Sequence, residues 1–303
     1  MPTDYPYHGR FAPSPTGPLH FGSLVAAVGS YLQARKNLGA WYLRIEDLDP
    51  PREVSGATNE ILRTLENYGL QWDKEILYQS QRNDIYLNAI EQLIQQGHAY
   101  PCGCSRKQIQ DNAISGRYGS IYQGFCRQGL GKDKRPSALR VLTNDSSITF
   151  IDQLRGRFEQ KLESEIGDFV VRRADKLFAY QLAVVVDDAA QDITEVVRGA
   201  DLLDNTPRQI HLQKLFNYPT PNYIHLPVAL NRNGQKLSKQ TGAPKIEGLR
   251  PQTVLFDVLR FLNQDPVSEI IDCNLDSFWQ WAIQNWQPSK VPAKDQHTPD
   301  LFL

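Results

Sequence analysis

The first hundred residues alternate short apolar runs with amphipathic stretches of helical period, and this alternation constrains the fold more than any other feature of the sequence. Strands are predicted at residues 9–14 and 40–45, and helices at 23–38, 53–68 and 82–96. Helices that separate strands in this way are typical of a parallel sheet, because each parallel connection has to cross one face of the sheet. The predicted fold class is therefore α/β, with a Rossmann-like doubly wound parallel sheet.

A basic segment interrupts this alternation. Residues 101–180 carry 14 basic and 9 acidic side chains, whereas residues 1–100 carry 8 and 11. After the basic segment, an apolar run at 178–186 predicts a buried strand or helix, and the sheet is expected to resume near 193–197. The predicted units are 1–100, the first half of the sheet domain; 101–177, a basic insertion; 178–245, the second half; and 246–303, a small helical C-terminal region.

Composition and charge narrow the class of protein. The 303 residues are 41% hydrophobic and 22% charged, which is typical of a folded globular chain, and four cysteines are too few for a disulfide framework. With 33 Lys and Arg against 34 Asp and Glu, no positive field of the whole molecule attracts nucleic acid, so any such binding has to be local. No stretch approaches the roughly 20 apolar residues that cross a bilayer. We therefore expect a cytoplasmic monomer with no membrane partner.

The segment 10–23 is the first of two polar segments that point to chemistry. It ends a predicted strand in a turn dense in proline and glycine and brings His20 to the start of a helix. Backbone N–H groups at a helix start form an anion site, and Gly22 permits the close approach of a nucleotide. On local physics alone, His20 could equally be a capping or solvated residue.

The second segment, residues 230–242, is a glycine-flanked loop that contains Lys236 and Lys239. Lysine ammonium groups are mobile point charges that can reach a polyphosphate, although such a loop could equally be a solvated surface turn. The glycine-rich signatures of P-loop and NAD-dependent enzymes are both absent from the sequence.

Together the two segments resemble the HIGH and KMSKS signatures of the class I aminoacyl-tRNA synthetases. The segments similar to the glutamate-specific branch, in that family's order, are residues 12–22, 168–173, 180–188 and 197–208. The resemblance covers about residues 8–245 and implies the catalytic core of this class. Only 64 residues follow Lys239, so we expect no large anticodon-binding part, and the chain resembles the truncated members of the branch.

This resemblance implies ATP-dependent activation of glutamate to glutamyl-adenylate without tRNA, followed by transfer of the glutamyl group to queuosine at the wobble position of tRNA(Asp). The implied catalytic groups are His20, Lys236 and Lys239; the implied ATP contacts are His20, Gly22 and Lys239, with Mg²⁺ accompanying the nucleotide. The residues implied to bind L-glutamate are Arg10, Phe11, Ala12, Pro13, Ser14, Glu46, Tyr180 and Arg198.

A site that binds glutamate needs a partner for each buried charge of the substrate. By resemblance Arg10 and Arg198 pair with carboxylates, which guanidinium groups bind bidentately, and Glu46 pairs with the ammonium. Taken alone, Glu46 could equally pair with Arg44 or Arg52 at the surface, and Tyr180 could be a core aromatic residue.

A metal site is predicted from three cysteines, Cys102, Cys104 and Cys126, which fall within a short basic segment. Basic neighbours favour the thiolate form that binds Zn²⁺, and a closed set of four ligands indicates a structural ion. The spacing of the sequence does not select the fourth ligand, which could be His98, Tyr118 or water. The family resemblance implies Tyr122.

The insertion around these cysteines is the candidate RNA-binding surface. Residues 101–140 hold 8 basic and 2 acidic side chains, with Tyr118, Tyr122 and Phe125 among them. Phosphate attraction together with aromatic stacking is how proteins hold unstacked bases, so we expect the anticodon loop to enter the core here. The alternatives are a solvated zinc knuckle, a truncated glutamyl-tRNA synthetase that charges a tRNA 3′ end, and a catalytically silent synthetase-like RNA-binding protein.

Overall fold

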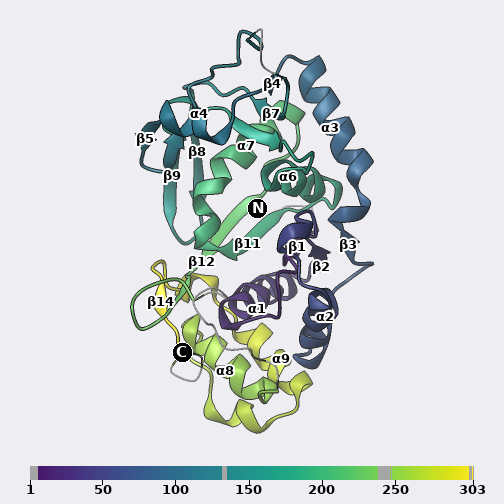
Figure 1. The fold of residues 1–303 in the computed structure, drawn as a ribbon. Coiled ribbons are helices and arrows are strands. Elements are labelled where there is room, and N and C mark those ends of the chain that lie inside the picture. Colours follow the sequence, from purple (N-terminus) through teal and green to yellow (C-terminus); the bar gives the residue numbers. More distant parts are fainter. Residues whose placement is uncertain (1–5, 132–134, 238–245, 247, 300–301, 303) are drawn as a thin grey trace.

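The main sheet is built from two groups of strands that lie side by side (Figure 1). It is seen in a computed structural model that describes residues 6–131, 135–237, 246, 248–299 and 302. One group has the order β1-β2-β3 and the other the order β11-β12-β8-β9. Strands β1 and β11 are neighbours, since the Thr194 N–H donates to the His8 carbonyl at 3.0 Å. The strands are β1 (His8–Phe11), β2 (Ala40–Ile45), β3 (Leu77–Tyr78), β8 (Ser147–Asp152), β9 (Gly156–Lys161), β11 (Glu195–Gly199) and β12 (Asn222–Leu226).

The central strands of this sheet, β1, β2, β11 and β12, are buried on both faces, as a doubly wound fold requires, whereas β8 and β9 leave side chains exposed. Strand β2 shows the alternation directly: Trp41 and Leu43 join one hydrophobic core, and Tyr42 joins the other. Helix α1 (Phe21–Lys36) packs on the first face, and α3, α6 and α7 cover the second. The helices of the second face are α3 (Asn83–Gln95), α6 (Tyr180–Ala190) and α7 (Thr206–Phe216). The predicted α/β class with a parallel sheet is confirmed, and the apolar run at 178–186 is a helix rather than a strand.

The basic segment forms a second, antiparallel sheet of order β10-β7-β4. Its elements are β4 (Ala99–Cys102), α4 (Arg106–Asp111), β5 (Ile114–Gly116), β6 (Gly119–Ile121), β7 (Ala138–Val141), α5 (Leu162–Glu165) and β10 (Phe169–Arg172). Strands β8 and β9 come from the same stretch of chain but extend the main sheet, because β8 pairs with β12. The insertion therefore contributes to both sheets.

The C-terminal region lies below α1 in Figure 1 and packs on it. Helices α8 (Pro251–Phe261) and α9 (Leu275–Asn285) pack on α1, and the Trp286 indole donates to the Gln33 side chain at 2.8 Å. Strand β14 (Gln296–His297) pairs with β13 (Ala229–Leu230). Helix α2 (Ala57–Asn67) completes this layer. No helix among the described residues is long and apolar enough to cross a bilayer.

Candidate active site

A cavity of about 620 Å³ opens at the carboxyl ends of β1, β2, β11 and β12, where doubly wound sheets place their ligands. The predicted site residues that line it are Arg10, Phe11, Ala12, Ser14, His20, Gly22, Glu46, Tyr180, Arg198 and Lys236. Pro13 lies behind this lining, and its carbonyl accepts the Glu46 backbone N–H at 3.0 Å. Lys239 lies outside the described residues.

His20 is both a helix cap and a wall of the cavity. Its Nδ1 accepts the backbone N–H of Ser23 at 3.4 Å at the start of α1, so the neutral ring carries its proton on Nε2. A Cβ at Gly22 would lie 3.2 Å from Cε1 of this imidazole. The glycine therefore makes room for the His20 ring, and an Nε2–H donor at a helix start suits an anionic ligand.

Lys236 reaches the same cavity from a turn more than two hundred positions later in the chain. Its Nζ forms an ion pair with Oδ2 of Asp201 at 2.6 Å, and its side chain is half exposed. The structure thus brings His20 and one lysine of the loop to a single cavity.

Arg10 is fixed by a carboxylate that the sequence did not single out. Its Nε and NH2 donate to the two oxygens of Asp188 at 3.1 and 3.3 Å, and Arg44 NH1 donates to Oδ1 of the same residue at 2.7 Å. Burial would raise the pKa of Asp188, but the charges of Arg10 and Arg44 lower it. The available signal was the Asp187-Asp188 pair inside an otherwise apolar run, since buried acidic residues need partners.

Glu46 lies at the end of β2 with its side chain only 9% exposed. Arg44 NH2 donates to its Oε1 at 3.3 Å, so a pair with Arg44 does form, although inside the cavity wall rather than at the surface. Burial raises the pKa of Glu46, and the nearby Arg44 and Arg10 oppose that shift. A carboxylate in this setting gains from a second cation, such as a ligand ammonium.

Arg198 lies at the end of β11 and is only 5% exposed. It donates through NH1 to the Tyr180 hydroxyl at 3.3 Å, through NH2 to Thr206 Oγ1 at 2.9 Å and through Nε to His225 Nε2 at 3.1 Å. Tyr180 is half-buried and contacts this charge, so it is more than a core aromatic residue. Neither Thr206 nor His225 is predicted from the sequence as a site residue; His225 lies in β12, shortly before the lysine loop.

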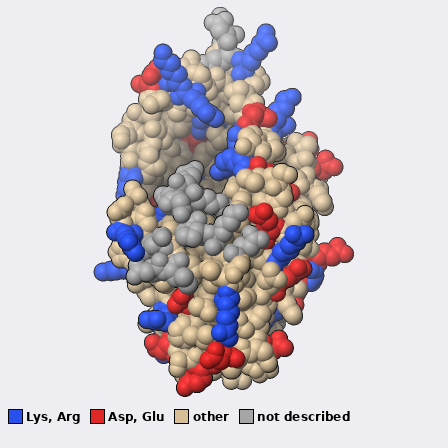
Figure 2. Space-filling model, turned by 60° about the horizontal axis from the view of Figure 1, so that its bottom comes forward, with Lys and Arg blue, Asp and Glu red and all other residues tan. Residues whose placement is uncertain are grey.

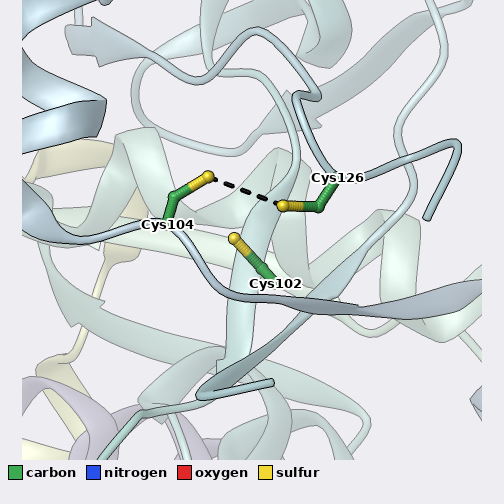
Figure 3. Close-up of side chains that lie close together, drawn as sticks. All are labelled: Cys102, Cys104 and Cys126. Atoms are coloured by element: carbon green, nitrogen blue, oxygen red, sulfur yellow. Dashed lines mark hydrogen bonds between the residues drawn. The ribbon is translucent and has the colours of Figure 1, made fainter. Parts of the chain in front are cut away.

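The three cysteines of the insertion point toward one another (Figure 3). Their sulfur atoms lie within 4.8 Å of one another, with Cys104 and Cys126 at 3.5 Å. The Tyr122 hydroxyl lies 3.3 Å from the Cys102 sulfur and 3.8 Å from that of Cys104. A tetrahedral ion with Zn–S bonds of about 2.3 Å needs ligand atoms at about 3.8 Å, so this donor set fits Zn²⁺.

Local charge also suits thiolate ligands. Burial would raise the pKa of Cys102, but hydrogen bonds from Tyr122 and the Cys104 backbone, together with Arg140, lower it to about 7. His98 is not among the described residues of this cluster, and the Arg117 guanidinium carbon lies 5.3 Å from the Tyr118 ring centroid.

The surface carries mixed charge. Figure 2 shows a hollow on one face of the molecule, with Lys and Arg side chains standing along its border. Among the described residues of 101–140, the exposed basic side chains are Arg106, Lys107, Arg117 and Arg135. Phe125 is 47% exposed and meets the Tyr122 ring edge-on.

Comparison with known proteins decides the family. Residues 7–252 match the model of the class I tRNA synthetases for E and Q, catalytic domain. Over 298 residues the chain is 51% identical to the glutamyl-Q tRNA(Asp) synthetase of Aromatoleum aromaticum, which covers 98% of this chain and 94% of that protein. It is 52% identical over 291 residues to the enzyme of the same name from Dechloromonas aromatica, covering 95% of this chain and 97% of that one. The chain belongs to this family.

A solved structure agrees with the fold. The glutamate tRNA ligase from Elizabethkingia meningosepticum, crystallised with its amino acid, superposes with a TM-score of 0.82 at 26% identity. The match covers 97% of this chain and 67% of that one. The family is therefore that of class I glutamate-type synthetases, as the four sequence segments indicated, and the protein is a ligase of the aminoacyl-tRNA synthetase type.

Proposed function

We propose that this protein activates glutamate with ATP in the absence of tRNA and transfers the glutamyl group to queuosine at the wobble position of tRNA(Asp). One observation carries the proposal: His20, Lys236, Glu46 and Arg198 line a single cavity, in a chain about half identical to glutamyl-Q tRNA(Asp) synthetases over nearly its whole length. A silent RNA-binding protein would have no use for these paired acidic and basic groups.

In the first step an α-carboxylate oxygen of glutamate bonds to the α-phosphorus of ATP, and pyrophosphate leaves. Negative charge grows on the phosphate oxygens, where preorganised donors give the most stabilisation. We assign these donors to His20 through its Nε2–H and to Lys236, with Lys239 as the third. Gly22 keeps the space beside the His20 ring, and Mg²⁺ would offset phosphate charge when it accompanies ATP.

Glutamate itself would be held between the two walls of the cavity. Arg198 meets a carboxylate, Glu46 meets the ammonium, and the Tyr180 hydroxyl adds a hydrogen bond. Arg10 offers its remaining N–H groups while Asp188 fixes its plane. The backbone of Phe11, Ala12, Pro13 and Ser14 would shape the floor of this pocket.

For the second step, the queuosine hydroxyl attacks the carbonyl carbon of the adenylate and AMP leaves. The anticodon loop would reach the cavity along the basic insertion, with phosphates on its exposed lysine and arginine side chains and a base against Phe125. We assign Cys102, Cys104, Cys126 and Tyr122 to a structural Zn²⁺ that holds the insertion in shape. The cytoplasmic location and the monomeric state of the protein stay predictions.

Glutamate-dependent exchange of pyrophosphate into ATP, measured with no RNA present, tests the proposal. We expect exchange, and then stable glutamylation of tRNA(Asp) that carries queuosine but not of tRNA(Asp) with guanosine at the wobble position. Exchange only with tRNA(Glu), with charging of its 3′ end, would favour a truncated glutamyl-tRNA synthetase. No exchange under any condition would favour the silent RNA-binding protein.

A further inference from the structure

Arg198 differs from the other arginines of the cavity in the groups that hold it. Among the described residues, its hydrogen-bond partners are the Tyr180 and Thr206 hydroxyls, the Leu202 carbonyl and the His225 imidazole, all of them neutral. Its guanidinium is nonetheless almost completely buried. A buried charge that neutral groups orient without compensating is suited to bind an anion.

His225 is the group behind Arg198 Nε, and a carboxylate fixes it in turn. The imidazole is fully buried, and its Nδ1 lies 2.7 Å from Asp152 Oδ2. The same oxygen accepts the His225 backbone N–H at 3.0 Å. The other oxygen of Asp152 accepts the backbone N–H groups of Leu154 and Arg155 at 3.0 and 2.8 Å. Asp152 is therefore an ionised acceptor whose place is set by the backbone of two strands and the turn after β8.

These contacts allow one protonation state of His225. Arg198 Nε is always a donor, so His225 Nε2 has to accept and carries no proton. The single ring proton then sits on Nδ1 and is donated to Asp152. A protonated ring would lose the acceptor and place a second cation beside the guanidinium.

We propose that His225, set in this tautomer by Asp152, is a positioning residue that fixes the plane of the Arg198 guanidinium for the substrate carboxylate. The inference rests on the proposed role of Arg198 in binding glutamate. The imidazole satisfies Nε without neutralising it, because the anion of Asp152 stands on the far side of the ring. A carboxylate directly on Nε would compensate the charge, as Asp188 does for Arg10, and an apolar residue would leave Nε unpaired in the interior.

The test compares two replacements of the same ring. In His225→Asn the amide can still donate to Asp152 but cannot reach Arg198, whereas in His225→Gln the longer amide can place its oxygen at the Nε2 position. We expect the KM for glutamate in pyrophosphate exchange to rise about 10- to 100-fold in His225→Asn, the cost typical of one hydrogen bond to a charged group. In His225→Gln most of that loss should be restored, and the KM for ATP should stay within about twofold in both variants.

His211 provides a matched control, since it is also a buried histidine but lies on α7 away from the cavity lining and contacts the Leu142 carbonyl. His211→Asn should leave the KM for glutamate unchanged. An unchanged KM in His225→Asn, or equal increases in both His225 variants, would overturn the inference while wild-type exchange still supported the proposed function. Absence of exchange in the wild type would instead refute the proposed function.

A measurement on the wild type keeps the inference testable even if a variant fails to fold. The ¹⁵N NMR signals of the His225 ring should show a protonated Nδ1 and an unprotonated Nε2 at neutral pH. A proton on Nε2 would overturn the inference, because that nitrogen could then accept nothing from Arg198.

Discussion

On the β1–β2 wall of the cavity, Arg10 and Arg44 meet two carboxylates, Asp188 and Glu46, at 2.7 to 3.3 Å. On the β11–β12 wall, Arg198 meets only neutral groups among the described residues. The first wall carries as many negative as positive charges when both carboxylates are ionised, and it is held together by them. On the second wall, the positive charge of Arg198 is available to pair with a ligand. The same residue type therefore serves mainly stability on one wall and mainly binding on the other.

The largest expected effect comes from removing the uncompensated charge. Arg198→Ala should lower kcat/KM for glutamate in pyrophosphate exchange by about 10²–10³-fold, since losing one partner of a buried charge contact typically costs 2–5 kcal/mol. The free energy of unfolding should change much less, because no anion is left unpaired. Steady-state exchange kinetics and urea denaturation measure the two quantities on one sample. A variant that is strongly destabilised yet binds glutamate normally would show that Arg198 serves stability rather than binding.

The compensated wall should respond in the opposite way. Asp188→Asn removes the charge that Arg10 and Arg44 share, and breaking such a buried pair typically costs about 3–5 kcal/mol of the free energy of unfolding. Its KM for glutamate should rise by less than tenfold. Urea unfolding followed by circular dichroism measures the loss in the free energy of unfolding. If Asp188→Asn raised the KM for glutamate more than Arg198→Ala does, the proposed difference between the two walls would be wrong.

A smaller effect is expected in the pH dependence of stability. Burial lowers the pKa of His225 to about 4, helped by the charges of Arg198 and Arg155 and opposed by Asp152. The unfolded chain takes up this proton near pH 6.5 and the folded chain only near pH 4, so stability falls as the pH drops through this window. The expected loss is about 2 kcal/mol between pH 7 and pH 5.

The His225→Gln variant isolates this contribution, since it cannot take up the proton in either state. Its free energy of unfolding should vary less between pH 7 and pH 5 than that of the wild type. The raised pKa of Glu46 acts with the opposite sign but is common to both proteins and cancels in the difference. Equal slopes for the two proteins would mean that His225 titrates normally and is not held between Asp152 and Arg198.

Local patterns in the sequence predicted much of the fold. The strand at 40–45 and the helix at 82–96 appear within one residue of their predicted ends, because they depend on periodicity alone. The first strand ends at Phe11 rather than at residue 14, since Pro13 has no N–H to donate. Helix α1 begins two residues early because the His20 side chain caps it.

The partners of the site residues could not be predicted in the same way. Arg10 and Asp188 are 178 positions apart, and no local pattern states which buried carboxylate a given arginine meets. The family resemblance supplied Arg10, Arg198 and Glu46, but neither it nor the spacing pointed to the imidazole of His225 behind the cavity wall. Such contacts follow from strand order, which brings β12 and β8 together.

A crystal structure with a non-hydrolysable glutamyl-adenylate analogue would test the account most directly. The free carboxylate of the analogue should lie within hydrogen-bond distance of the Arg198 guanidinium, its ammonium beside Glu46, and its phosphate beside His20 Nε2. An analogue bound with that carboxylate away from Arg198, or outside the cavity, would contradict the account.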